Sequence, residues 1–191
     1  MSTSATAYHH GDLRTAVLRS AGKLLEKEGV AALSLREVAR RAGVSHNAPY
    51  RHFPDRDALL AALAAEGFER LGEALQANAG REMGAAYVRF ALAHPQRFRL
   101  MFGGLLKLAR YPELARASAS AHGALVAAMR AQKEIQDPDT AAAAAWSLVH
   151  GLAHLLLDGH FAQAAGQDAG PFIDRVLCSV RFSALGAQRS A

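Results

Sequence analysis

Residues 34–60 read SLREVARRAGVSHNAPYRHFPDRDALL, and this stretch decides the expected fold. Ser34 and Glu37 form an S-x-x-E capping box, which predicts the start of a short helix. Gly43 supplies the backbone conformation of a tight turn after that helix. The stretch therefore predicts two short helices joined by a turn. This is the build of a helix-turn-helix, which places its second helix in the major groove of DNA.

The second helix of this pair is expected to be capped by Ser45 or Asn47 and to leave residues 46–53 as an exposed rod. Pro49 is compatible with this helix because it lies in the first turn, where a missing N–H costs little. Donors on the exposed face can reach base edges or phosphates. The predicted base contacts are His46, Asn47 and Arg51, and the predicted phosphate contacts are Ser34, Ser45, Tyr50, His52 and Arg56.

Charge supports a nucleic-acid partner for this region. The chain of 191 residues has a formal net charge of +5, and a local basic excess lies between residues 29 and 54. The arginines there are opposed by Glu37 alone, and they are Arg36, Arg40, Arg41 and Arg51. Such a patch is the electrostatic signature of a phosphate backbone. An ordinary solvated helix pair is the alternative for each residue taken singly, but the combined pattern favours double-stranded DNA.

Outside this region the sequence predicts helices throughout. Ala, Leu, Arg and Glu dominate, strand signals are nearly absent, and Pro and Gly mark regular breaks. About nine helices are expected, including residues 12–28 and 56–78. We predict an all-α chain, with a helix-turn-helix DNA-binding domain in residues 1–56 and a larger helical domain in residues 57–191.

The residues indicate a cytoplasmic protein with no membrane partner. One cysteine, Cys178, excludes an internal disulfide and favours a reducing compartment. The N-terminus has no apolar segment of the kind found in signal peptides. The most apolar run, residues 146–157, is too short for a membrane span and contains His150 and His154.

Residues 33–60 resemble the DNA-binding domain of TetR-type transcriptional regulators, on the motif Ser34, Arg36, Val38-Ala39, Ala42-Gly43-Val44-Ser45, Tyr50, His52-Phe53, Arg56 and Leu59. The opening YHHGDLR of residues 8–14 and the W-x-x-x-H-G of Trp146, His150 and Gly151 are similar to one subgroup of that family, which carries a Trp-His-Gly signature. For residues 8–14, contact with DNA and packing on the first helix both stay open.

The resemblance implies a homodimer that regulates transcription and responds to a small ligand. Carried over by position, it adds Arg36 to the DNA contacts named above. Repression of a pseudo-palindromic operator, with release by an apolar effector, is the expected mechanism. Family members differ from this chain at Asn47-Ala48, so the operator sequence is its own.

The second domain is expected to hold the effector and the dimer interface. Aromatic, Met and His side chains of its middle helices are the candidate effector site, although ordinary core is the alternative for each. They are Tyr87, Phe90, Phe98, Met101, Phe102, Leu105, His122, Met129, Trp146 and His150. Apolar faces of two late helices, near residues 138–161 and from residue 171, predict a four-helix interface. Its candidates are Leu148, Leu152, Leu155, Ile173, Leu177 and Val180.

Enzyme and metal interpretations are weaker. His150, His154 and Asp158 share one helix face, but the motif is HGLAH and lacks the glutamate of HExxH metalloproteases. No nucleophile elbow or phosphate loop occurs, so no catalytic residue, metal or cofactor is predicted. The rival function is a helical small-molecule or metal carrier whose first unit binds another protein.

Overall fold

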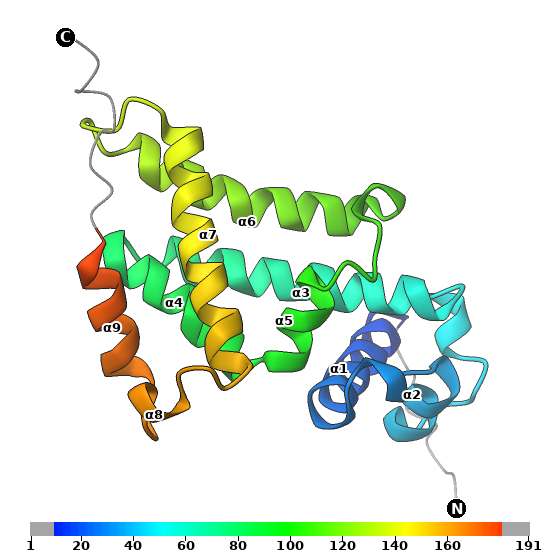
Figure 1. Ribbon diagram of the computed structural model, residues 1–191. Coiled ribbons are helices and arrows are strands. Elements are labelled where there is room, and N and C mark those ends of the chain that lie inside the picture. The colour runs from blue at the N-terminus through cyan, green and yellow to red at the C-terminus, as the bar shows by residue number, and fades with distance from the viewer. Residues whose placement is uncertain (1–9, 181–191) are drawn as a thin grey trace, which may run out of the picture. The chain divides into compact units, whose positions relative to one another are not determined.

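The structure, a computed structural model, describes residues 10–180 of the chain. Within these residues it contains nine α-helices, three short 3-10 helices and no strand (Figure 1), which confirms the predicted all-α class. The α-helices are α1 (His10–Glu28), α2 (Leu35–Ala42), α3 (Arg56–Gln76), α4 (Gly80–Ala93), α5 (Pro95–Phe102), α6 (Pro112–Arg130), α7 (Pro138–Leu157), α8 (Ala162–Ala165) and α9 (Gly170–Ser179). The 3-10 helices are η1 (Val30–Ala32), η2 (Pro49–Arg51) and η3 (Leu108–Arg110).

Proline and acidic caps set the helix starts, as the sequence pattern predicts. Three helices begin at a proline: α5 at Pro95, α6 at Pro112 and α7 at Pro138. A proline is tolerated there because the first N–H groups of a helix have no intrahelical partner. The Asp137 side chain accepts a hydrogen bond from the N–H of Thr140 at 3.1 Å and so caps α7.

The chain forms two compact units. Unit 1 comprises residues 1–65 and 96–114, and unit 2 comprises residues 66–95 and 115–191, as far as each is described. In unit 1 the apolar side chains of α1, α2 and the first half of α3 are buried together. Its fully buried side chains include Val17, Leu24, Leu25, Leu33, Val38, Leu59, Leu60 and Leu63. The predicted division after residue 56 remains a prediction; the compact unit is larger and draws on a second segment.

The second segment of unit 1 is held to the first by polar contacts. The Glu26 carboxylate of α1 accepts hydrogen bonds from the N–H groups of Gln96 and Arg97, at 3.2 and 3.1 Å, and thereby caps α5. The Arg97 guanidinium is 4% exposed and donates to the carbonyl oxygen of Leu63 in α3 at 3.0 Å. Arg97 of α5 is therefore bonded to two other helices of unit 1, to α1 through its backbone N–H and to α3 through its side chain.

In unit 2, α4 packs against both α7 and α9 (Figure 1). Gly84 makes this possible, because a Cβ there would lie 3.4 Å from side-chain atoms of both Val149 and Leu177. A smaller apolar cluster of Met129, Ala142 and Ala145 joins α6 to α7.

The apolar helix α7 is long and hydrophobic enough to cross a membrane, by length and composition only, with a mean hydropathy of 1.4 over its best window. Only 28% of that window is buried inside the chain. From the sequence, residues 146–157, which contain His150 and His154, are expected to be too short for a membrane span, whereas the helix itself runs over 20 residues. A helix with this composition is also found where one chain packs on another.

Candidate nucleic-acid interface

Helix α2 begins and ends as predicted. The N–H of Glu37 donates to the Ser34 side-chain oxygen at 3.1 Å, which caps the helix. Gly43 follows the helix in the left-handed conformation, with φ 69°, and its N–H is directed at the carbonyls of Ala39 and Arg40. A residue with a side chain would be strained at this φ, so the turn depends on glycine.

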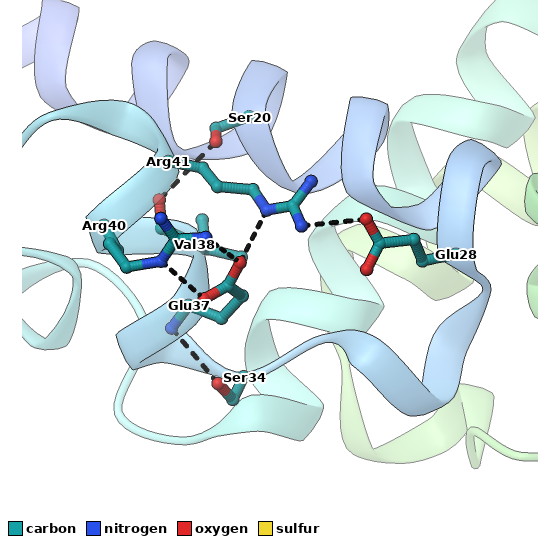
Figure 2. A network of polar contacts seen from close by, with 7 residues as sticks. All are labelled: Ser20, Glu28, Ser34, Glu37, Val38, Arg40 and Arg41. Atoms are coloured by element: carbon teal, nitrogen blue, oxygen red, sulfur yellow. Dashed lines mark hydrogen bonds and ion pairs between the residues drawn. The ribbon is translucent and has the colours of Figure 1, made fainter.

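Glu37, the second residue of the predicted capping box, bonds through its side chain to arginine side chains. The Glu37 carboxylate accepts two hydrogen bonds from Arg40, at 2.9 and 2.7 Å, and one from Arg41 at 2.6 Å (Figure 2). Arg41 also donates to Glu28, at the end of α1, at 2.8 Å. The hydrogen bonds from Arg40, which have the larger effect, and from Arg41 lower the pKa of Glu37 to about 2. Two carboxylates thus neutralise two guanidinium groups on this surface.

This pairing changes which basic residues are available to a partner. Glu37 is the only carboxylate among residues 29–54, which hold the four arginines, but in the structure Glu28 of α1 also pairs with Arg41. Within residues 10–180, Arg36 and Arg51 are exposed and take part in no ion pair. They are the uncompensated cations of the helix-turn-helix region.

The predicted second helix of the motif is wrong in its form. Residues 45–53 are a series of tight turns that contain the 3-10 helix η2, and neither Ser45 nor Asn47 caps it with a side chain. The N–H of Ala48 bonds to the carbonyl of Ser45 at 2.9 Å, three residues back. Pro49 has no N–H with which to bond to the carbonyl four residues back, so the α-helical pattern is not established before it.

The candidate DNA contacts in this segment lie largely at the surface. Ser45, His46, Asn47 and Arg51 are exposed, and Tyr50 is 47% exposed although it is aromatic. Their neighbours Pro49 and Phe53 are buried and anchor the segment. Outside the segment, Ser34 and Arg36 on α2 are also exposed. His52 is different, since its Nε2 is buried and has no hydrogen-bond partner within the described residues.

Arg56 has an internal role that the sequence did not indicate. Its guanidinium donates to the carbonyl of Leu33 at 2.7 Å through Nε and to that of Val30 at 2.7 Å through Nη2. These bonds connect the start of α3 to the loop between α1 and α2. Backbone carbonyls removed from water need hydrogen-bond partners, so these two bonds mean that Arg56 stabilises unit 1 itself.

Four of the ten candidate effector residues gather in unit 2. The indole N–H of Trp146 donates to the hydroxyl of Tyr87 at 3.0 Å, and this hydroxyl lies 2.8 Å from Nδ1 of His150. The ring of His122 lies 5.3 Å from that of Trp146, and His154 lies 4.6 Å from His150. We call these five side chains the aromatic cluster. Burial raises the pKa of Tyr87, and burial followed by the nearby His154 lowers the pKa of His150.

The other candidate effector residues lie elsewhere. Phe98, Met101, Phe102 and Leu105 belong to the segment of unit 1, where Leu105 is 54% exposed. Met129 belongs to the separate cluster with Ala142 and Ala145. Phe90 is buried on α4, with its ring 5.2 Å from that of His94.

The candidate dimer residues fall into a buried group and a group that reaches the surface. Leu152, Ile173 and Leu177 are buried within the chain itself, because α7 and α9 pack on α4, so these three are not surface available to a partner. Leu148 is half-buried, while Leu155 and Val180 are 40% and 37% exposed.

Several structural residues were missed by sequence reasoning. Glu26, Glu28 and Arg97 looked like ordinary surface charges, because nothing local indicates a partner many residues away. One signal was present at Gly22, which lies inside α1 without any turn to explain it. The residues 10–180 contain no group of three or more His, Cys, Asp or Glu side chains placed to hold a metal ion.

Comparison with known proteins gives consistent results at both ends of the chain. The family model of the Tetracyclin repressor-like C-terminal domain matches residues 81–180, and that of bacterial regulatory proteins of the tetR family matches residues 17–63. A protein of unknown function from Rhodococcus sp. RHA1 is 37% identical, with a TM-score of 0.74 over 91% of this chain and 94% of that one.

More distant solved structures share the fold. A regulatory protein in the tetR family from Rhodococcus RHA1 is 19% identical, with a TM-score of 0.65 over 87% of this chain and 94% of that one. NalD, the secondary repressor of the MexAB-OprM multidrug efflux pump in Pseudomonas aeruginosa, is 20% identical, with a TM-score of 0.59 over 88% of this chain and 93% of that one. No protein of curated function matches the chain.

Proposed function

Because the chain belongs to the TetR family of bacterial regulatory proteins, and is therefore a transcriptional regulator and not an enzyme, we propose that it represses transcription as a homodimer on a pseudo-palindromic operator. In this proposal a small apolar effector releases the protein from DNA. It works in the cytoplasm, where bacterial DNA is found. The W-x-x-x-H-G pattern of Trp146, His150 and Gly151 supports its place in the subgroup with that signature.

The observation that carries the proposal is the pair of uncompensated cations on an exposed helix-turn-helix surface. Arg36 and Arg51 meet no carboxylate within the described residues, whereas Arg40 and Arg41 on the same surface are paired. Unpaired guanidinium groups are suited to phosphate or to guanine edges. His46, Asn47 and the 47%-exposed Tyr50 provide further donors beside them.

Dimerisation is supported by the exposed apolar face of α7. The helix has a mean hydropathy of 1.4, yet only 28% of its window is buried inside one chain. A second copy that covers this face would remove the remaining apolar surface from water. The same association places two DNA-binding units on one operator, and a single small unit rarely buries enough surface for tight binding.

An effector in unit 2 is supported by the aromatic cluster, where an indole, a phenol and one imidazole are joined by part-buried hydrogen bonds. An effector can shift the regulator only by binding one arrangement of the dimer better than another.

The test is selection of bound sequences from a random DNA library by the full-length protein. We expect one pseudo-palindromic site. Substitutions of His46 or Asn47 should change the preferred bases, at about 1–3 kcal/mol for each mismatched pair. Tyr50→Ala should weaken binding with little change in the preferred sequence, because a phosphate contact carries no base information.

Salt dependence separates this function from the rival carrier. The logarithm of DNA affinity should fall linearly with the logarithm of salt concentration, by about 0.9 for each phosphate contact. Uptake of an apolar molecule by a carrier would barely respond to salt. A wild-type protein that selects no sequence, and whose DNA binding is insensitive to salt, would remove the regulator interpretation.

A further inference from the structure

Helix α2 carries two arginines on one face. Arg36 and Arg40 are four residues apart, so their side chains leave the helix on the same side. Leu35, Val38 and Ala39 are buried and form the opposite face. The first helix of a helix-turn-helix crosses the DNA backbone, so a face with two guanidinium groups is suited to phosphates.

The two arginines differ in their pairing. Arg36 takes part in no ion pair within residues 10–180. Arg40 donates to the Glu37 carboxylate through Nε at 2.9 Å and through Nη2 at 2.7 Å (Figure 2). An arginine also binds a phosphate through two parallel N–H groups of this kind. A carboxylate and a phosphate would therefore compete for the same edge of Arg40, whose side chain is 70% exposed.

Arg41 is held differently, by two carboxylates from two helices. Its guanidinium donates to Glu37 at 2.6 Å and to Glu28 at 2.8 Å, and its side chain is only 30% exposed. Figure 2 shows the Arg41 side chain extended toward Glu28. Loss of Glu37 would leave Arg41 with its second carboxylate, whereas Arg40 would lose both of its hydrogen bonds. Glu37 thus controls the availability of Arg40 in particular.

The Glu37 side chain acts on the charge of this surface more than on its shape. The Ser34 cap of α2 uses the backbone N–H of Glu37, which does not depend on the carboxylate. Ion pairs exposed to solvent also contribute little to stability. The hydrogen bonds from Arg40, and secondly from Arg41, lower the pKa of Glu37 to about 2, so the carboxylate stays charged near neutral pH. Another anion, and not a proton, is what can replace it on Arg40.

We propose that Arg40 is a further phosphate contact of the DNA-binding surface, and that Glu37 holds it in reserve by standing in for the phosphate. This inference rests on the proposed function, since the phosphate belongs to the DNA bound by unit 1. DNA binding exchanges one anion for another on Arg40, which lowers the affinity below that of a free arginine. A phosphate contact carries no base information, so the effect applies to operator and other DNA alike.

Glu37→Gln tests this role in the full-length protein, with a duplex of mixed sequence as the probe and fluorescence anisotropy over a series of salt concentrations. The released Arg40 should raise the affinity and steepen the slope of log affinity against log salt by about 0.9, the value of one phosphate contact. Between about 50 and 200 mM salt this adds a loss of about threefold. Glu28→Gln is the matched control. It removes the same charge from the same cluster, leaves both bonds between Arg40 and Glu37, and should keep the wild-type slope.

Two double variants identify the arginine that responds, and both have the net charge of the wild type. Glu37→Gln with Arg40→Gln should return the slope to the wild-type value, whereas Glu37→Gln with Arg41→Gln should keep the steeper slope. Urea unfolding of each variant checks that unit 1 is folded.

Four results would each overturn the inference: an unchanged slope in Glu37→Gln, weaker binding by that variant, an equal effect of Glu28→Gln, or a steeper slope that survives the loss of Arg40. Selection of an operator by the wild type separates the two proposals. Operator selection together with any of these results overturns only the role of Arg40, whereas a wild type that selects no sequence overturns the proposed function.

Discussion

Gly22 leaves room for the side chain of Arg97, because a Cβ on Gly22 would lie 2.7 Å from Nη2 of Arg97. Gly22 lies inside α1, where a glycine ordinarily destabilises the helix relative to alanine. The guanidinium that occupies the space comes from α5 and bonds to the carbonyl of Leu63 in α3. The glycine is thus explained by a residue far along the chain.

Gly22→Ala should destabilise the protein by about 1–3 kcal/mol, because the added methyl overpacks a buried and hydrogen-bonded side chain. The matched control is Gly123→Ala in α6, where a Cβ meets nothing within 4 Å. That change should stabilise the protein by up to about 1 kcal/mol, as alanine does in an open helix interior. Urea unfolding of both variants measures the difference. Equal effects of the same sign would contradict the steric argument.

Glu37→Gln should increase affinity for DNA. Without the carboxylate, Arg40 and one side of Arg41 lose their partner and become available to phosphates. We expect the slope of log affinity against log salt to become steeper by about one. Glu82→Gln, which removes a carboxylate from an ion pair with Arg89 in unit 2, is the control of equal charge. Weaker binding by Glu37→Gln would show that the carboxylate positions the arginines and does not mask them.

Arg56→Ala and Arg51→Ala should have opposite consequences. Loss of the Arg56 bonds to two backbone carbonyls should lower the free energy of unfolding by about 2–3 kcal/mol. Arg51 is exposed and has no ion pair within the described residues, so its loss should leave stability nearly unchanged and reduce the salt slope for DNA binding. Thermal unfolding and DNA titration on the same samples distinguish the two roles.

Leu155→Glu should convert the proposed dimer to monomers, because it places a charge on the exposed apolar face of α7. Leu108→Glu provides the control. Leu108 is 45% exposed and Leu155 is 40% exposed, but Leu108 lies on η3 in unit 1. Analytical ultracentrifugation should show a mass change for the first variant alone. A dimer that survives Leu155→Glu would place the interface on another face.

His150 should make unit 2 sensitive to acid. Its folded-state pKa is lowered by burial, so the unfolded chain takes up the proton first as the pH falls below about 6.5, the ordinary histidine value. Stability is therefore fully present above that pH and declines below it. His150→Gln should flatten this decline. Trp146 is the only tryptophan of the chain and touches the same network, so its fluorescence reports the change directly.

Local features of the fold could be predicted from the sequence because their causes are local. Ser34 caps the helix that follows it, Gly43 takes the left-handed turn, and Pro112 and Pro138 begin helices, since each depends on backbone groups within a few residues. The prediction of a helix over residues 46–53 is wrong for a local reason too: Pro49 is compatible with the first turn of a helix, but here it lacks the N–H that would make the first helical hydrogen bond.

Features that depend on distant partners could not be predicted. Arg36 and Arg51 are exposed cations in the structure, as expected. The pairing of Arg41 with Glu28 could not be expected, because it depends on how α1 and α2 pack. Leu152, Ile173 and Leu177 have the spacing of an interface, and a pattern of spacing cannot say whether the facing helix is from the same chain. The same applies to Arg97, whose partners lie on α1 and α3.

The Glu26–Arg97 contact has a practical consequence for hybrid regulators. An exchange that grafts residues 1–56 from a relative onto this chain would bring in a foreign α1 and leave Arg97 with the host. Without a glycine at position 22, a side chain on the foreign α1 would meet the guanidinium of Arg97. Without a carboxylate at position 26, the backbone N–H groups of Gln96 and Arg97 would lose their hydrogen-bond acceptor. A chimaera that transplants DNA specificity should therefore carry residues 96–114 with its first helices, or alter only the exposed positions between Ser45 and Arg51.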